Sequence, residues 1–182
     1  RIDGRGVVRH DDCGDGPVPA KRTRQVDAGH QGSRNKTRIK TYTMATNIST
    51  ILLNAPIEKV WKTLTQPELV KQWQYGSDLI TDWNVNSEIR FRNEWEGQVF
   101  EQWGTVLEII PNQKIKYSLF FPRPELEDKP ENYFVMSYVL TEENQKTKLE
   151  IVQEDNRPGA VQEKPQGEEN PILQALKTLI ES

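Results

Sequence analysis

A series of segments between residues 89 and 151, in which apolar side chains recur at every second position, constrains the fold more than any other feature of the sequence. Successive side chains of a β-strand point to opposite faces, so a period of two predicts strands with one buried face. The alternating positions are Ile89 and Phe91; Ile115, Tyr117, Leu119 and Phe121; Phe134, Met136, Tyr138 and Leu140; and Leu149 and Ile151. Turn-forming residues at 96–97, 111–114 and 141–146 separate the segments, and such short links favour hairpins in an antiparallel sheet.

Helical patterns lie on both sides of this region. After a strand predicted at 47–53, Pro56 is suited to the first position of a helix, and apolar side chains follow at helical spacing. Those side chains are Ile57, Val60, Trp61 and Leu64. Thr65 and Glu68 have the spacing of a capping box, which predicts a second short helix with Pro67 in its first turn. At the other end, Asn170 and Pro171 open a last helix with a wide apolar stripe.

The predicted order of elements is one strand, two short helices, six strands in a meander and one C-terminal helix. This order indicates an α+β domain. One apolar face of the sheet must be covered, and the last helix is the element available to cover it. Residues 122–132 and 156–170, rich in proline and polar side chains, are predicted as loops.

Composition divides the chain at about residue 43. Residues 1–43 carry ten Lys or Arg against five Asp, and they have no apolar periodicity. We expect them to be a disordered leader or an artefact of upstream sequence, the alternative being a basic arm that contacts an acidic partner. Residues 44–182 carry fourteen Lys or Arg against twenty-two Asp or Glu, and they form the predicted domain.

The residue types of the domain exclude several functions. Both histidines and the single cysteine fall in the first 43 residues, so His-based acid–base catalysis, thiol chemistry and zinc binding are not expected, and no cofactor is predicted. An acidic body is a poor binder of phosphate backbones, so nucleic acid is not an expected partner. The sequence shows neither a long apolar run nor a signal peptide, and its lone cysteine suits a reducing compartment, so we expect a cytoplasmic protein without membrane insertion.

Several stretches resemble one known superfamily. They are "NAPIEKVWKTLTQPELVKQW", "GTVLEIIPNQKIKYSLFF", "TKLEIVQED" and "NPILQALKTLIES", and together they cover most of residues 48–182. The sequence is similar to the START-like, or SRPBCC, superfamily, and within it to homologues of the activator of the 90-kDa heat-shock chaperone ATPase, of the C-terminal-domain type. The resemblance implies a helix-grip fold: a curved seven-stranded antiparallel sheet wrapped around a C-terminal helix. It also implies a cavity between sheet and helix for a lipid-like or other small apolar molecule.

Ten residues are predicted to line that cavity, the alternative for each being a place in a packed core. The aromatic residues and one methionine are Trp83, Phe91, Trp95, Trp103, Tyr117, Met136 and Tyr138. Gln153 follows Leu149 and Ile151 on the same strand parity, and a polar side chain on an inward face needs a partner. Ile172 and Leu176 lie on the apolar stripe of the last helix.

The sequence leaves three alternative functions open. The first is non-enzymatic binding of a small hydrophobic molecule, lipid-like or aromatic, in the cavity. The second is a chaperone-associated role in the stress response, with a heat-shock chaperone as partner, which rests on the resemblance alone. The third is a cyclase- or dehydratase-like enzyme using carboxylates, for which Glu94, Glu96, Glu101 and Asp155 are the candidates, the alternative for them being solvated positions at the edge of the sheet. The identity of the ligand does not follow from the residues.

Overall fold

In the computed structural model, the structure describes residues 44–182, so the predicted leader 1–43 lies outside the described part. The strands are β1 (Ala45–Leu53), β2 (Asp78–Ile80), β3 (Glu88–Trp95), β4 (Gln98–Ile110), β5 (Lys114–Leu119), β6 (Phe134–Glu143) and β7 (Lys146–Asp155). The helices are α1 (Ile57–Thr65), α2 (Pro67–Trp73), the 3-10 turn η1 (Pro130–Asn132) and α3 (Pro171–Glu181). The predicted order of elements is confirmed.

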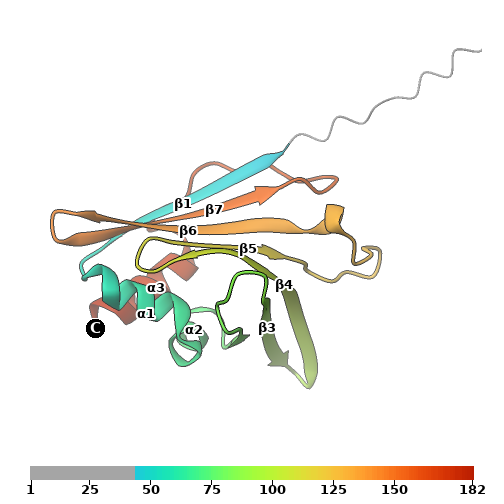
Figure 1. The fold of residues 1–182 in the computed structure, drawn as a ribbon, viewed down its shortest axis with the longest axis horizontal. Helices are drawn as coiled ribbons and strands as arrows, with labels where there is room; N and C mark the ends of the chain where they lie inside the picture. The colour runs from blue at the N-terminus through green and yellow to red at the C-terminus, as the bar shows by residue number, and fades with distance from the viewer. Residues whose placement is uncertain (1–43) are drawn as a thin grey trace, which may run out of the picture. The chain divides into compact units, whose positions relative to one another are not determined.

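The seven strands form one antiparallel sheet in the order β1-β7-β6-β5-β4-β3-β2. Strands β2 to β7 are a meander of neighbouring hairpins, and β1 returns to pair with β7 at the far edge. The helices α1, α2 and α3 lie together on one side of this sheet (Figure 1). The predicted helix-grip fold is therefore confirmed.

The core fills the space between the sheet and the three helices. Each helix buries its apolar side there: Val60 and Leu64 from α1, Val70 and Trp73 from α2, and Leu173, Leu176 and Ile180 from α3. The facing strands supply residues from the alternating apolar positions of the sequence. Ile89, Ile115 and Leu149 are examples, and none of them has exposed surface. Burial of these side chains is the main force that holds the helices on the sheet.

The junction between α1 and α2 differs from the predicted capping box. Thr65 is the last residue of α1, and its hydroxyl donates to the carbonyl of Trp61 at 2.8 Å instead of capping α2. Gln66 occupies the N-cap of α2, with no side-chain hydrogen bond there. The reason is that the two helices are joined through a single residue, which leaves the Thr65 side chain on the preceding turn. Pro56 likewise stands at the N-cap of α1, one position before the predicted one.

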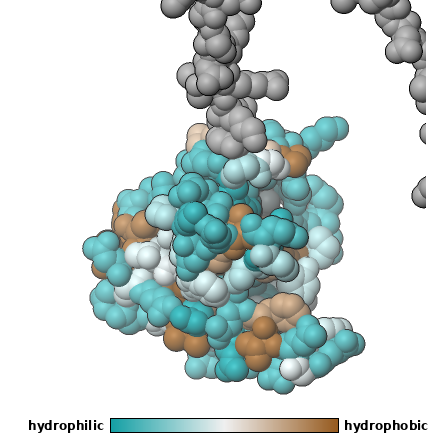
Figure 2. All heavy atoms as spheres, turned by 90° about the vertical axis from the view of Figure 1, so that its right-hand side faces the viewer, coloured by the Kyte–Doolittle hydropathy of each residue, from teal (hydrophilic) through white to brown (hydrophobic). Residues whose placement is uncertain are grey.

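The hairpin β3–β4 projects beyond the helices. Glu96 and Gly97 form its two-residue turn, and both have positive φ, 50° and 75°, as a type I′ turn requires. Trp95, Val99 and Phe100 near this turn are 70%, 48% and 45% exposed. Figure 2 shows apolar atoms gathered at the lower end of the domain, where the hairpin projects.

A connecting segment that we call the strap, residues 156–170, runs back from β7 along the open edge of β1. The strap pairs with β1 through two backbone hydrogen bonds, Gln166 N to Ile48 O and Thr50 N to Gln166 O, each 2.9 Å long. The side chain of Gln162 reaches both backbone groups of Thr46, accepting at 2.7 Å and donating at 2.6 Å. The strap therefore covers an edge that would otherwise offer unpaired backbone groups.

Gly104 on β4 provides the first prediction. A Cβ atom at this position would lie 1.9 Å from the backbone oxygen of Ser118 on β5, so no rotamer change can relieve the clash. We expect Gly104→Ala to lower the free energy of unfolding by about 2–4 kcal/mol, as measured by urea denaturation. Gly167→Ala is the control, because its closest neighbour is the flexible carboxylate of Glu169, and it should change stability by less than about 1 kcal/mol. Equal stability of the two variants would contradict the close approach of β4 and β5.

Candidate ligand-binding site

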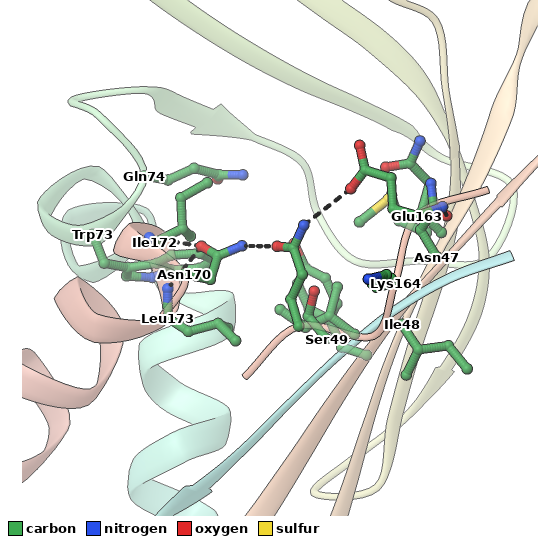
Figure 3. Close-up of a pocket in the computed structure, with 15 residues that line it drawn as sticks. Asn47, Ile48, Ser49, Trp73, Gln74, Glu163, Lys164, Asn170, Ile172 and Leu173 are labelled. Carbon is green, nitrogen blue, oxygen red and sulfur yellow. Dashed lines mark hydrogen bonds between the residues drawn. The ribbon is translucent and has the colours of Figure 1, made fainter. Parts of the chain in front are cut away.

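A pocket of about 270 Å³ lies between the sheet and the N-terminal end of α3. Its walls come from β1, β6, β7, the end of α2, the first turn of α3 and the strap. Figure 3 shows the labelled side chains converging on this space from α2, α3 and the strap. The pocket thus occupies the place between sheet and C-terminal helix where the sequence predicts a cavity.

Seven of the residues that line the pocket are apolar or aromatic. They are Ile48, Trp73, Met136, Tyr138, Ile151, Ile172 and Leu173. Trp73 is held in place because its indole N–H donates to the carbonyl of Thr63 at 3.1 Å. The hydroxyl of Tyr138 is satisfied by that of Tyr117 at 2.9 Å, and burial raises the pKa of both phenols, so the pair stays neutral. These polar atoms are therefore already used, and the side chains offer mainly apolar surface to a ligand.

A chain of hydrogen bonds fixes part of the polar lining. Asn170 caps α3 by accepting from the backbone N–H groups of Ile172 and Leu173, at 2.9 and 3.4 Å. The Asn170 amide donates to Gln166 at 2.5 Å, and the Gln166 amide donates to Glu163 at 3.0 Å (Figure 3). The first turn of α3 and the strap are thus positioned as one unit around the pocket.

Asn47 on β1 ties the strap to the sheet. Its carboxamide oxygen accepts from the backbone N–H of Glu163 at 2.7 Å, and its amide donates to the carbonyl of Val161 at 3.1 Å. The Asn47 side chain thus bonds to one backbone N–H and one backbone carbonyl of the strap, as the backbone of a neighbouring strand would. The strap wall of the pocket consequently depends on side-chain hydrogen bonds as well as on the two backbone bonds.

Gln74, the residue that follows α2, is different from these carboxamides. Its side-chain oxygen is buried and has no hydrogen-bond partner within residues 44–182. Buried polar atoms are satisfied in the large majority of cases, and leaving one unsatisfied costs about 1–3 kcal/mol. Gln74 lines the pocket with the rest of its side chain, because this oxygen itself is shielded from the open space.

An ion pair anchors the start of the strap. Arg157 donates to both carboxylate oxygens of Asp155, at 2.9 and 2.6 Å, and its guanidinium lies 4.6 Å from the ring centre of Phe134. Burial of Asp155 favours its neutral form, but the hydrogen bonds from Arg157 outweigh that effect and lower the pKa of the carboxyl group. A smaller contribution in the same direction comes from the carboxamide of Gln153.

Of the ten predicted cavity residues, the structure brings Met136, Tyr138, Gln153 and Ile172 to the pocket. Phe91, Tyr117 and Leu176 are buried in the neighbouring core instead. The Phe91 ring packs 5.9 Å from that of Tyr117, centre to centre. Trp83 packs beside the core, and its indole donates to the carbonyl of Thr65 at 3.0 Å.

Trp95 and Trp103 are not at the pocket. Trp95 ends β3 on the projecting hairpin, where no helix reaches it, and it is 70% exposed. Trp103 pairs with Arg90, which alternates with the inward-facing Ile89 and Phe91, so it lies on the opposite face of the sheet. There its indole donates to Asp128 at 3.0 Å, and its ring packs against that of Phe120 at 5.4 Å.

Residues that the sequence did not single out complete the site. They are Asn47, Ser49, Gln74, Glu163, Lys164, Gln166 and Asn170, together with several apolar neighbours. Asn170 carried a sequence signal as a helix cap, but the polar residues of the strap carried none. Their place at the pocket follows from the return of the strap along β1, which no local pattern encodes.

The carboxylates proposed for an enzyme do not converge. Glu101 pairs with Arg90 at 2.9 Å on the outer side of the sheet, and Asp155 pairs with Arg157. Glu94 and Glu96 are exposed at the hairpin end. Within residues 44–182, no cluster of three or more His, Cys, Asp or Glu could hold a metal ion. No helix in that part of the chain is long and apolar enough to cross a membrane.

The curved antiparallel sheet, the covering C-terminal helix and the pocket between them define a START-like domain. The profile of one family, "Activator of Hsp90 ATPase homolog 1-like protein", matches residues 54–181. The chain belongs to this family, and the resemblance seen in the sequence is confirmed. No protein of curated function matches the sequence.

Solved structures agree with this assignment. A protein of Cytophaga hutchinsonii, known from a solution structure, is 34% identical, with a TM-score of 0.54 over 64% of this chain and 79% of its own. A crystal structure from Chromobacterium violaceum is 22% identical, with a TM-score of 0.58 over 75% of this chain and 97% of its own. Another from Mesorhizobium loti is 21% identical, with a TM-score of 0.55 over 75% and 96%. The last two show the shared fold.

Asp155 gives a prediction about pH. Its folded pKa is lowered, so the stability that it contributes is complete above the unfolded pKa of about 3.9 and is lost as the pH falls through the folded value. We expect Asp155→Asn to cost about 2 kcal/mol at pH 7, and the difference from the parent chain should shrink as the pH is lowered from 5 to 2. Urea unfolding across this range measures it. Glu88→Gln, which removes an exposed partner of Arg90, should cost under about 0.5 kcal/mol. A difference for Asp155→Asn that does not change with pH would contradict the assignment.

Proposed function

We propose that this domain binds a small, mainly apolar molecule in the pocket between the sheet and α3, without transforming it. The observation that carries the proposal is the pocket itself: about 270 Å³ at the position where a helix-grip fold leaves room between its two layers. Seven apolar or aromatic residues and eight polar ones line it, and small-molecule sites combine apolar surface with polar groups that fix the orientation of the ligand.

The chemistry of the lining supports binding over catalysis. Among the fifteen described residues at the pocket, Glu163 is the one carboxylate, and it is exposed and accepts a hydrogen bond from Gln166. General acid–base catalysis needs a titrating group held within reach of the substrate. The remaining polar groups there are carboxamides, a serine hydroxyl, the exposed Lys164, and the Tyr138 hydroxyl and Trp73 N–H, which are already hydrogen-bonded within the domain. Burial raises the pKa of Tyr138, so its phenol stays neutral. Carboxamides and hydroxyls orient a ligand by hydrogen bonding and do not exchange protons near neutral pH.

Filling the pocket tests this function. Ile172 lies at its wall on the first turn of α3, so Ile172→Trp adds bulk where there is space. We expect this variant to lose binding of the neutral fluorescent probe N-phenyl-1-naphthylamine at least tenfold, with a change in stability below about 1 kcal/mol. Fluorescence titration and urea unfolding give the two values.

The matched control lies one turn further along α3. Leu176 is fully buried in the packed core and does not line the pocket, so Leu176→Trp should overpack the core and cost about 1–3 kcal/mol. If the parent chain binds no probe, or if Ile172→Trp binds it as tightly as the parent, the binding function fails.

A second function is favoured by the β3–β4 hairpin. Trp95 and Phe100 lie on the same face of this hairpin, because Phe100 pairs with Asn93, two residues before Trp95. Exposed aromatic side chains on a projecting element are typical of surfaces that bind other proteins. Under this second proposal the hairpin contacts a heat-shock chaperone, the partner named by the family to which the chain belongs.

The hairpin function predicts a measurable effect on the chaperone. The full chain should raise the ATPase rate of the 90-kDa heat-shock chaperone about twofold or more, and the double variant Trp95→Ser, Phe100→Ser should abolish that increase. Val85→Ser is the control, because Val85 is also exposed, at 50%, but lies away from the hairpin turn. Failure of the parent chain to change the rate would argue against a chaperone partner and would leave the pocket function untouched.

A further inference from the structure

We propose that the free edge of β3, at the tip of the β3–β4 hairpin, binds an extended, basic segment of a partner protein, which adds to the sheet as an antiparallel strand opposite Glu94. The inference deepens the second proposed function and rests on it only in taking the hairpin as a contact surface. It follows from the strand register, from the charges at the tip and from the exposure of its apolar side chains.

The outer edge of β3 is only partly covered. The short strand β2 pairs with residues 90–92 of β3 and begins at Asp78, opposite Arg92. Residues 93–95 therefore continue β3 beyond its outer neighbour, on the part of the hairpin that projects away from the helices (Figure 1). A strand edge without a neighbour presents unpaired backbone groups, to which another chain can add a strand.

The register shows which backbone groups face this edge. Trp103 on β4 exchanges backbone hydrogen bonds with Phe120, at 3.3 and 2.7 Å, so its N–H and carbonyl point away from β3. Because the direction alternates along a strand, the backbone groups of Phe100 point toward β3, where they meet its partner Asn93. The N–H and carbonyl of Glu94, one residue further along β3, therefore point to the free edge. Among residues 44–182, no other segment forms a backbone hydrogen bond with them.

The tip carries negative charge that no cation of the described residues neutralises. Glu94 and Glu96 are exposed and form no salt bridge within residues 44–182. Glu101, further from the turn, is by contrast paired with Arg90 and Arg92. A strand that pairs with Glu94 places a side chain beside this carboxylate on the outer face of the sheet, where an opposite charge stabilises the pair. The domain as a whole, with fourteen Lys or Arg against twenty-two Asp or Glu, also attracts a basic segment at longer range.

The inner face of the tip supplies apolar surface. Trp95 and Phe100 lie on this face and are 70% and 45% exposed. In an added strand, the residues before and after the one opposite Glu94 point to the same inner face, so apolar side chains there would cover the indole of Trp95. The segment that fits the edge therefore has a basic residue at every second position and apolar residues between them.

Two other occupants are disfavoured by the same observations. A second copy of the chain that paired through this edge about a twofold axis would set Glu94 directly against Glu94, and like charges in that position are destabilising. A lipid bilayer would have to take up two carboxylates and a backbone edge without hydrogen-bond partners, both of which are costly in lipid. A basic extended segment instead meets the carboxylates and satisfies the edge.

Three fluorescein-labelled peptides of alternating lysine and valine test the pairing. One is unmodified, one is N-methylated on the backbone at each lysine, and one is N-methylated at each valine. In an antiparallel strand the lysine opposite Glu94 directs its N–H to β3 and the valines direct theirs away, so only methylation at lysine removes the bond. Fluorescence anisotropy with the full chain should give an affinity about tenfold lower for the lysine-methylated peptide and a nearly unchanged one for the valine-methylated peptide. Equal affinities, or the reverse order, would overturn the inference.

A matched pair of charge variants tests the place of binding. Glu94→Lys should lower the affinity for the unmodified peptide about tenfold, because it sets like charges opposite one another. Glu142→Lys is the control: Glu142 is also an exposed strand residue near a hairpin turn, without a salt bridge among the described residues, but it lies on β6. This control should change the affinity less than about twofold. Equal losses in the two variants would indicate nonspecific attraction to an acidic domain and would overturn the inference.

The remaining outcomes separate this inference from the function on which it rests. If the unmodified peptide does not bind but the chain still raises the ATPase rate of the chaperone, this inference alone is overturned. If the peptide does not bind and the chain leaves that rate unchanged, the contact function of the hairpin is overturned with it.

Discussion

The pairing of β1 with β7 is the interaction on which the rest of the structure depends. It runs over nine residue pairs, from Ala45 opposite Asp155 to Leu53 opposite Thr147, and joins the beginning of the domain to its last strand. Because β1 leads directly into α1 and β7 leads through the strap into α3, this pairing brings the helices from both ends of the domain onto one face of the sheet. The packing of α3 against α1, α2 and β1 follows from it. Without this pairing the meander β2–β7 would have no cover for its apolar face.

The character of the pocket follows from the limited length of α3. The helix has eleven residues, and its buried positions Leu173, Leu176 and Ile180 face a packed core. The strap, which precedes the first turn of α3, borders the sheet along β1 there, and its side chains are largely polar. The pocket lies at this junction of helix and strap, so its lining combines apolar side chains with carboxamides. A longer helix would have continued the apolar cover, and the site would then have suited a different class of ligand.

Much of the fold could be predicted because strands and helices leave a period in the sequence. Tyr117 and Tyr138 were correctly placed on the inward face by alternation alone. Trp103 was not, because β4 lacks clear alternation, and its parity becomes evident only from its pairing with Arg90. The site was harder to predict for a physical reason: Gln74 and the strap residues lie in non-repetitive segments, whose positions are determined by contacts distant in sequence. Asn47, for example, meets Glu163 across 116 residues.

The way in which the strap is held also bears on the order of folding. The hairpins of the meander join residues that are close in sequence, whereas β1 must find β7 across about a hundred residues, which is slow because a long loop must close first. The strap can pair with β1 only after that step, so this wall of the pocket forms late. The strap is held by two backbone hydrogen bonds and a set of exposed side-chain hydrogen bonds. A segment held mainly by solvent-exposed hydrogen bonds opens as a unit before the whole domain unfolds. Exchange of the buried interior with bulk water would then proceed through this unit, independently of global unfolding.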